Sequence, residues 1–268
     1  MNTDEIRSRF RALHEGGTFL MPNPFDEGSC RLLEGLGFSA LATTSGGFAA
    51  SRGRMDMTGG RSELVDHVAS LCRVTDLPLN VDAEQCYPDD EGGVAGTVRL
   101  LAMTGAAGCS IEDWNPHDGV IEDLDRATEQ VAVAASAADD EGMLLTARAE
   151  NHLRGVDDLD DTIARLSAYR DAGAHVVYAP ALTDRSAIAR IVDEVGGPVN
   201  VLLVPGGPSL DELAELGVRR LSVGSSLARV AYGAFYEAAL GLRDSGGLAA
   251  DGTYLDRGVA SDSFATIV

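Results

Sequence analysis

The stretch Val199–Val223, VNVLLVPGGPSLDELAELGVRRLSV, contains one complete unit of the fold. A short apolar run, Val199–Leu203, is followed by a turn rich in proline and glycine and then by residues with helical periodicity. Ser209 is a typical start for such a helix and Gly217 a typical end, and a second apolar run, Arg220–Val223, comes soon after that glycine. A buried strand, a helix and a second buried strand in this order are typical of a parallel β-sheet.

The same alternation of apolar runs and helical stretches continues along the whole chain. An amphipathic helix at Thr3–Glu15 comes first, and a helical stretch follows each of eight apolar runs. The expected strands are Thr18–Met21, Ala40–Thr43, Leu79–Val81, Cys109–Ile111, Leu144–Ala147, Val176–Ala179, Val199–Leu203 and Arg220–Val223. The clearest helices between them are Arg61–Cys72, Gly93–Met103, Leu124–Ala138 and Thr162–Ala172. Eight strand–helix units favour the α/β class and a closed (β/α)8 TIM-type barrel over an open doubly wound sheet.

A length of 268 residues suits one such barrel, and no linker or low-complexity segment divides the sequence. We therefore expect a single domain over residues 1–268. Residues 1–17 form its N-terminal helical segment, residues 226–242 its last helix, and residues 243–268 a C-terminal tail.

The chain is strongly acidic, with a net charge of −21 at pH 7, and its acidic residues are spread along the whole length. An acidic surface repels phosphate backbones and anionic lipids, so neither nucleic acid nor a membrane is an expected partner. The first residues, Met1–Phe10, contain no apolar run that would indicate a signal peptide, and no segment has the length of a membrane-spanning helix. The protein is therefore expected to be cytoplasmic.

The sequence contains no lysine, and all 21 basic residues are arginine. Without lysine the chain cannot form an internal Schiff base, which excludes lysine-type aldolases and ordinary pyridoxal-phosphate enzymes. Carbon chemistry would depend instead on a metal, on arginine or on an acid/base pair. The four cysteines have no metal-ligand spacing: Cys30, Cys72 and Cys109 are expected in the core, whereas Cys86 is expected either to pack or to supply a thiol.

Acidic residues gather where the third and fourth expected strands end, which in a parallel barrel is the catalytic face. Asp82 and Glu84 are two residues apart and would share one face of a strand, and Glu112 follows the adjacent strand. Three carboxylates close together are unfavourable unless they are protonated or bound to a cation. Oxygen ligands without cysteine or histidine favour Mg²⁺, with Mn²⁺ as a second choice. Helix caps or solvated loop acids are the alternative interpretation of each residue alone.

Two further sets of residues at strand ends could bind an anionic substrate. They are Thr44, Ser45, Gly46 and Gly47 after the second strand, and Arg148, Glu150 and Asn151 after the fifth. The hydroxyl and backbone N–H groups of the first set could face an anion, although a plain glycine turn has the same sequence. Arg148 could form paired hydrogen bonds with a carboxylate, or an ion pair with Glu150. A small carboxylate is the expected ligand.

The polar, glycine-rich segment Ala49–Arg61 is long for a strand–helix connection and is expected to be a mobile lid. Asp56 lies at its centre, where it is either an acid/base group or a solvated surface residue. His117 and His152 are further candidates for proton transfer, because histidine titrates near neutral pH.

Together these residues resemble the isocitrate lyase/phosphoenolpyruvate mutase superfamily. The matching segments occur in the family's order over most of the chain, from Phe19 to Ala234. They are MPNPFDEGSCRLLEGLGFSALATTSGG (residues 21–47), GRMD (53–56), VDAE (81–84), SIED (110–113), TARAEN (146–151) and the late stretch from PVNVLL to YGAF (198–235).

The resemblance implies a barrel that binds Mg²⁺ through Asp82, Glu84 and Glu112, partly through water. It also implies that the Ser45–Gly47 segment and Arg148 hold the carboxylate and oxo oxygens of a pyruvate-like substrate. In such an enzyme the metal and the arginine stabilise a pyruvate enolate as a bond to its C3 is made or broken.

Asp56 matches the lid acid of the mutase members. Family members also exchange the last barrel helix, here Ser226–Leu242, between subunits, which implies a homodimer or homotetramer. Isocitrate and methylisocitrate lyases carry a Lys-(Lys/Arg)-Cys-Gly-His lid after the fourth strand, whereas Asp113–Ile121 here reads DWNPHDGVI. Cys86 occupies a position where the family usually has glycine, and the lid lysine of phosphonopyruvate-handling members is absent.

The sequence thus predicts a Mg²⁺-dependent carbon–carbon lyase that cleaves or decarboxylates a small 2-oxo or hydroxy carboxylate through a pyruvate-enolate-like intermediate. Arg148 and the metal would hold the oxo acid, and Asp56, His117 or His152 would transfer the proton. One alternative is a mutase or hydrolase that acts on a C–P bond, with phosphonopyruvate or phosphoenolpyruvate as substrate. The other is a barrel that binds a carboxylate without turning it over.

Overall fold

The computed structural model describes residues 2–249 and 252–264. Its central sheet has eight parallel strands in the order β1-β10-β9-β8-β7-β4-β3-β2. They are β1 (Phe19–Leu20), β2 (Leu41–Ala42), β3 (Leu79–Asp82), β4 (Gly108–Glu112), β7 (Leu144–Arg148), β8 (Val176–Tyr178), β9 (Val199–Leu202) and β10 (Arg220–Ser222). Each one overlaps a strand expected from the sequence, so the prediction of a TIM-type β/α barrel is confirmed.

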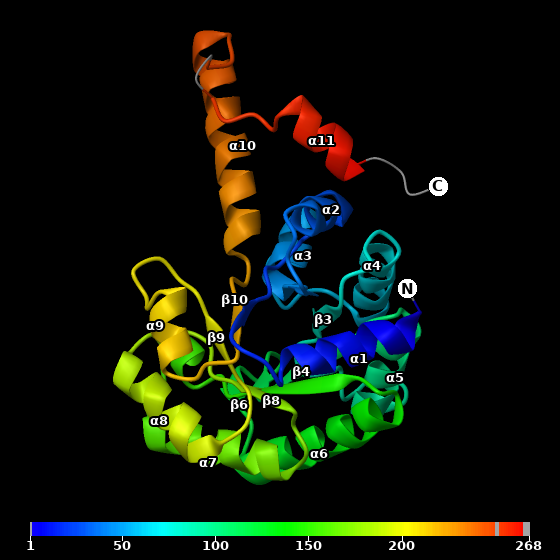
Figure 1. Cartoon of the computed structure of the whole chain (residues 1–268), viewed down its shortest axis with the longest axis vertical. Coiled ribbons are helices and arrows are strands. Elements are labelled where there is room, and N and C mark those ends of the chain that lie inside the picture. The colour runs from blue at the N-terminus through cyan, green and yellow to red at the C-terminus, as the bar shows by residue number, and fades with distance from the viewer. Residues whose placement is uncertain (1, 250–251, 265–268) are drawn as a thin grey trace.

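Helices surround this sheet (Figure 1). They are α1 (Thr3–Leu13), α2 (Glu27–Gly35), α3 (Ser45–Ser51), α4 (Arg61–Cys72), α5 (Gly93–Met103), α6 (Leu124–Asp140), the 3-10 helix η1 (His152–Arg154), α7 (Leu159–Asp171), α8 (Arg185–Val195), α9 (Leu210–Glu215), α10 (Ser226–Ser245) and α11 (Arg257–Phe264). A two-stranded hairpin that the sequence did not predict, β5 (Trp114–Asn115) and β6 (Val120–Ile121), follows β4. No helix in the described part of the chain is long and apolar enough to cross a membrane.

Contacts at the carboxyl ends of β1 and β2 close the barrel. The Ala42 N–H donates to the Pro22 carbonyl at 3.1 Å, which joins the two strands at the ends of the sheet order. The Asn23 side chain donates to the Thr43 carbonyl at 2.8 Å and accepts from the Val223 N–H at 2.9 Å. Asn23 therefore ties together the segments that follow three strands, at the edge where the candidate acids lie.

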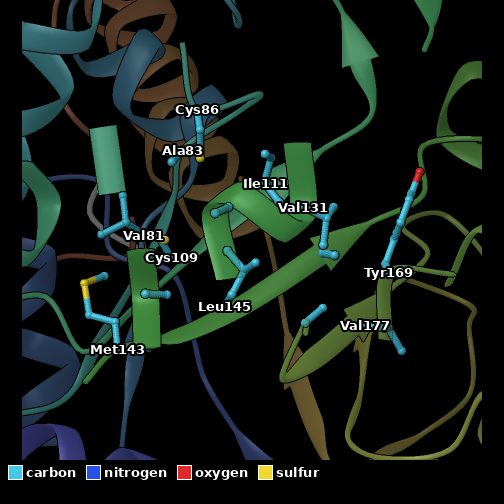
Figure 2. Close-up of a cluster of buried hydrophobic side chains, with 14 of the residues drawn as sticks. Val81, Ala83, Cys86, Cys109, Ile111, Val131, Met143, Leu145, Tyr169 and Val177 are labelled. Carbon is cyan, nitrogen blue, oxygen red and sulfur yellow. The ribbon is translucent and has the colours of Figure 1, made fainter. Parts of the chain in front are cut away.

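The two faces of the curved sheet differ in chemistry. Outward-pointing side chains are apolar, and Figure 2 shows Val81, Cys109 and Leu145, which are register partners on β3, β4 and β7 and are fully buried. Many inward-pointing side chains are polar. One row of register partners consists of Glu112, Arg148, Tyr178, Asn200 and Arg220. Because successive residues of a strand point to opposite faces, the same short strands supply an apolar core outside and a polar lining inside.

Helix α1 covers the end of the barrel at which the strands begin. Its Phe10 is fully buried and packs with an apolar cluster that includes Ala107 and Leu144, at the starts of β4 and β7. Arg7 of the same helix donates hydrogen bonds to three backbone carbonyls that precede these strands. This end is therefore sealed, and the opposite end is free for a site.

Helix α10 projects away from the barrel (Figure 1). Ala228 is its one buried residue, and Val230, Phe235 and Tyr236 are 68%, 72% and 62% exposed. The chain then returns, and α11 packs against α2 in the same subunit (Figure 1). Of the predicted tail 243–268, residues 250–251 and 265–268 lie outside the described residues.

Candidate functional site

A cavity of about 220 Å³ opens at the edge where the strands end and extends into the barrel. Five residues expected from the sequence line it, namely Thr44, Ser45, Asp56, Asp82 and Arg148. Deeper polar residues that the sequence did not single out also line it, among them Asn80, Ser110, Thr146, Tyr178, Asn200, Arg220 and Ser222. These five predicted residues therefore share one cavity with a polar layer inside the barrel.

The segment after β2 is the start of a helix and not an open turn. The Thr44 hydroxyl accepts a hydrogen bond from the Gly47 N–H at 3.4 Å and caps α3, which begins at Ser45. The Ser45 N–H donates to Asp82 Oδ2 at 3.0 Å. The alternative of a plain glycine turn is wrong, because the threonine cap starts a helix at this point. The backbone of the segment contacts a site carboxylate directly.

The predicted lid, Ala49–Arg61, is a loop only over residues 52–60, because its first three residues belong to α3 and Arg61 begins α4. Asp56 extends from this loop to the cavity. A Cβ atom on Gly46 would lie 3.1 Å from Asp56 Oδ2, so the absence of a side chain at position 46 allows the close approach. The loop thus brings an exposed acid over the first turn of α3.

Arg148 is the centre of a buried ion network. Its Nη1 donates to Asp82 Oδ1 at 2.7 Å, and its Nη2 lies 3.1 Å from Glu112 Oε2. Its Nε and Nη2 donate to Glu150 Oε1 at 3.0 and 2.8 Å. The guanidinium also lies over the Tyr178 ring, with Cζ 5.4 Å from the centroid. The expected ion pair with Glu150 is therefore present, and two further carboxylates share the same cation.

A second arginine, which the sequence did not single out, lies behind this network. Arg154 Nη2 is 3.8 Å from Glu112 Oε1 and 3.5 Å from Glu150 Oε2, and its guanidinium stacks over Trp114 at 4.0 Å. Burial raises the pKa of both Glu112 and Glu150, and the charge of Arg148 opposes this rise. The neighbouring cations thus lower the cost of ionising these two buried glutamates.

The loop after β3 contains three non-glycine residues with positive φ: Glu84 at 52°, Cys86 at 59° and Tyr87 at 47°. This conformation is uncommon for side-chain-bearing residues and accounts for the glycine that the family carries at the position of Cys86. The Cys86 thiol is fully buried and lies 3.5 Å from the Ser110 carbonyl, and burial raises its pKa. Of the two roles expected for Cys86, packing is confirmed.

Asp82, Glu84 and Glu112 lie near one another but do not converge on one point. Within the described residues no three acidic, histidine or cysteine side chains are grouped so as to hold a metal, and Arg148 binds both Asp82 and Glu112. The donor chemistry nevertheless fits a hard cation. Burial, together with the charges of Asp82 and Asp56, raises the pKa of Glu84 to about 7, and Glu112 Oε1 is buried without a hydrogen-bond partner. A divalent cation would stabilise both groups.

Eight of the thirteen predicted site residues do not line the cavity, namely Gly46, Gly47, Glu84, Glu112, His117, Glu150, Asn151 and His152. His117 lies on the turn of the β5–β6 hairpin, with its side chain 92% exposed. His152 begins η1, and its Nε2 lies 3.3 Å from Thr162 Oγ1. Asn151 donates to Asp161 Oδ2 at 2.7 Å. The His117 side chain therefore faces solvent, and the other two side chains are held by partners on α7.

Asp113, next to Glu112, supports the site from behind and was not singled out by the sequence. Its Oδ2 accepts from the Tyr169 hydroxyl at 2.7 Å and from Arg165 Nη1 at 3.2 Å. Its Oδ1 accepts from the Glu150 N–H at 2.9 Å. The strand period could have indicated this role, since Glu112 and Asp113 must point to opposite faces of the sheet. Asp113 thereby fixes the backbone that carries a partner of Arg148.

Comparisons with known proteins agree with this geometry. Residues 10–243 match the family model of phosphoenolpyruvate phosphomutase. The crystal structure of a lyase/mutase candidate from Burkholderia cenocepacia J2315 superposes with a TM-score of 0.93 at 46% identity, over 99% of this chain and 97% of that one. An uncharacterized protein of Mycobacterium tuberculosis (strain CDC 1551 / Oshkosh) is 33% identical over 215 residues, 79% of this chain and 80% of that protein. Oxaloacetate decarboxylase of Paraburkholderia xenovorans (strain LB400) is 32% identical over 218 residues, 77% of this chain and 70% of that protein.

Proposed function

Because the chain belongs to the phosphoenolpyruvate phosphomutase family, we propose that it is a Mg²⁺-dependent carbon–carbon lyase or decarboxylase for a small 2-oxo or hydroxy carboxylate. The observation that carries this proposal is the network of Arg148 with Asp82 and Glu112 at the edge of the cavity. A similar oxaloacetate decarboxylase supports a substrate of this kind.

The rim of the cavity has donors suited to a carboxylate. The Ser45 N–H and Arg148 Nη1 both donate to the carboxylate of Asp82. A substrate carboxylate at the rim would compete with Asp82 for these two donors, and Arg148 would stabilise negative charge that develops on the substrate oxygens. When bound through Asp82, Glu84 and Glu112, Mg²⁺ would supply Lewis-acid polarisation of the oxo group.

Asp56 is the acid best placed to move a proton among the residues expected for that role. It lines the cavity from the loop over α3, whereas His117 and His152 do not line it. Asp56 would donate a proton to the enolate carbon once the bond has broken.

Replacing Asp82 with alanine tests the proposal. Pyruvate and CO₂ release should be measured with oxaloacetate, 2-methylmalate and phosphonopyruvate, each with Mg²⁺ and with a chelator. We expect metal-dependent turnover of a carbon substrate by the unchanged protein and a fall of roughly 10²–10³ in kcat/KM in the variant, because an electrostatic contact to the reacting group is lost. Titration calorimetry should show weaker Mg²⁺ binding.

The matched control is Asp211→Ala, which removes an exposed acid in the first turn of α9 and should leave both measurements unchanged. Full activity and full metal affinity in Asp82→Ala would refute the proposal. Turnover of phosphonopyruvate alone would select C–P chemistry at the same site.

We also propose that α10 is covered by a second copy of the chain in a homodimer or homotetramer. Its exposed apolar residues, among them Val230 and Phe235, form the kind of surface that association buries. The double variant Val230→Asp, Phe235→Asp should shift the protein to a monomer in sedimentation velocity, because the charges would be buried at the contact. Met103→Asp, at a site 83% exposed on α5, is the control and should leave assembly unchanged. A monomeric unchanged protein would contradict the assembly.

A further inference from the structure

A buried arginine lies at the floor of the cavity and contacts only uncharged groups. Arg220 is 2% exposed and lines the cavity. Its Nε donates to Asn200 Oδ1 at 2.9 Å and its Nη2 to Thr146 Oγ1 at 2.7 Å. Its Nη1 lies 3.4 Å from Nε2 of His14.

His14 is neutral, so it does not alter the charge of this group. Its Nδ1 lies 2.9 Å from the Phe10 carbonyl, which can only accept, so this nitrogen carries the hydrogen and Nε2 accepts from Arg220. Burial, together with the charge of Arg220, lowers the pKa of His14 to about 3. Burial also lowers the pKa of Arg220 to about 9, which leaves the guanidinium charged at neutral pH.

The described residues place no carboxylate within ion-pair distance of Arg220. A guanidinium has five N–H groups, and the three contacts above use three of them, so two remain. Burying a cation without a counter-charge is costly, and an anion beside the two remaining N–H groups would remove much of that cost. Arg148 is different, because three carboxylates already surround it.

A second polar atom without a partner belongs to a residue that lines the same cavity. Asn80 lines the cavity, and its Oδ1 is buried without a hydrogen-bond partner. Asn80 comes two residues before Asp82 on β3, and Thr146 comes two residues before Arg148 on β7, so these two residues lie roughly 6–7 Å deeper along their strands than the rim. The guanidinium of Arg220 reaches this depth because it donates to Thr146. The cavity of about 220 Å³ joins the two levels and equals the liquid volume of roughly seven water molecules.

We propose that the floor around Arg220 is an anion subsite that binds the distal carboxylate of a dicarboxylic substrate whose oxo- or hydroxy-acid end is held at the rim. The carboxylate accepts from the two remaining N–H groups of Arg220. The Asn80 amide, turned by half a rotation, donates to the same group. This inference rests on the proposed function for the rim and adds a recognition site beneath it.

Two ligands that differ in one group test the subsite in the protein as it stands. Malate and 2-hydroxybutyrate are identical except that a methyl group replaces the distal carboxylate in the latter. Their affinities should be measured by calorimetry and thermal shift with a chelator present, so that neither metal nor turnover contributes. We expect malate to bind about 10–100-fold more tightly, as a charge-assisted contact requires. Equal affinities would overturn the subsite. It would also be overturned if chloride raised the melting temperature as much as malate does at the same concentration.

Arg220→Met should reduce the preference for malate to less than about threefold while affinity for 2-hydroxybutyrate is kept. Arg219→Met is the matched control, because its side chain does not line the cavity, and it should keep the preference. Circular dichroism checks that each variant is folded. If Arg220→Met is not folded, Arg220→Gln replaces it, because its amide can still donate to Asn200. An unchanged preference in a folded variant would overturn the assignment of Arg220. An Arg220-dependent preference without turnover of any substrate would contradict the lyase function and leave the subsite standing.

Discussion

Replacing Arg148 with methionine should abolish turnover and lower the free energy of unfolding by about 3–5 kcal/mol at pH 7, because one partner of a buried ion network is removed while the others stay. Asp82, Glu112 and Glu150 would each lose their closest cation. Glu112 is 4% exposed and Glu150 fully buried, so solvent cannot replace the lost contacts. Urea unfolding followed by circular dichroism measures the stability, and pyruvate release measures turnover.

The loss of stability in Arg148→Met should shrink as the pH falls. Burial raises the pKa of Glu112 and Glu150 in the folded protein, and removing Arg148 takes away a charge that opposes this rise. A carboxyl whose folded pKa lies above its unfolded value stabilises the protein below the unfolded pKa of 4.5, and that contribution is lost as pH rises through the folded pKa. The difference in the free energy of unfolding between the variant and the unchanged protein should therefore shrink as the pH is lowered from 7 to the unfolded pKa.

Arg190→Met is the control, because Arg190 forms its ion pairs with Glu194 and Asp160 on the surface, where water screens them. It should change stability little and without dependence on pH. If Arg148→Met were as stable as this control at pH 7, the buried network would not be what holds the strand ends together.

The sequence was sufficient to place all eight strands of the barrel. Each strand sends every second side chain outward under the helices, and these positions are apolar, as Val81, Cys109 and Leu145 show. Capped helices such as the one that begins after Ser209 separate the runs, and the Ser209 hydroxyl does accept from the Glu212 N–H, at 3.3 Å. Apolar runs and caps are local features, so both can be recognised without knowing the tertiary fold.

The rim of the cavity was also predictable, because the residues that directly end a strand must lie there. Asp82 and Arg148 follow from this rule, and both line the cavity. The inner layer was missed because runs such as VNVLL were interpreted as continuously apolar, although Asn200 interrupts the run at an inward position. Arg220 carries the same signal: an arginine inside a buried strand needs a polar interior.

The candidate histidines show where sequence reasoning stops. His117 and His152 both follow strand ends closely, as rim residues do, yet the hairpin turns the first toward solvent and η1 turns the second toward α7. The direction of a side chain after a strand depends on the path of the next few residues. That path here depends on contacts with distant residues, one of which is the hydrogen bond that the Glu150 N–H donates to Asp113 Oδ1.

Replacing Asp113 with alanine should therefore lower both stability and activity, although Asp113 does not line the cavity. The free energy of unfolding should fall by about 1–3 kcal/mol, because the buried hydroxyl of Tyr169 loses its acceptor and the half-buried Arg165 loses one of its acceptors. The Glu150 N–H would lose its acceptor as well, so the backbone that positions a partner of Arg148 would be less well fixed. We expect kcat to fall while Mg²⁺ affinity, measured by calorimetry, is kept.

Asp113→Asn separates charge from shape in this network. Its amide oxygen can still accept from the Glu150 N–H, so the backbone should stay in place and kcat should recover. The charge beside Arg165 is still missing, so the free energy of unfolding should lie between the values of the alanine variant and the unchanged protein. Asp160→Ala, which removes an exposed acid of α7, should match the unchanged protein in both measurements. If Asp113→Ala kept its activity despite a loss of stability, the ion pairs with Arg148 and Arg154 would be sufficient to position Glu150. The hydrogen bond from its backbone N–H to Asp113 would then not be needed for the site.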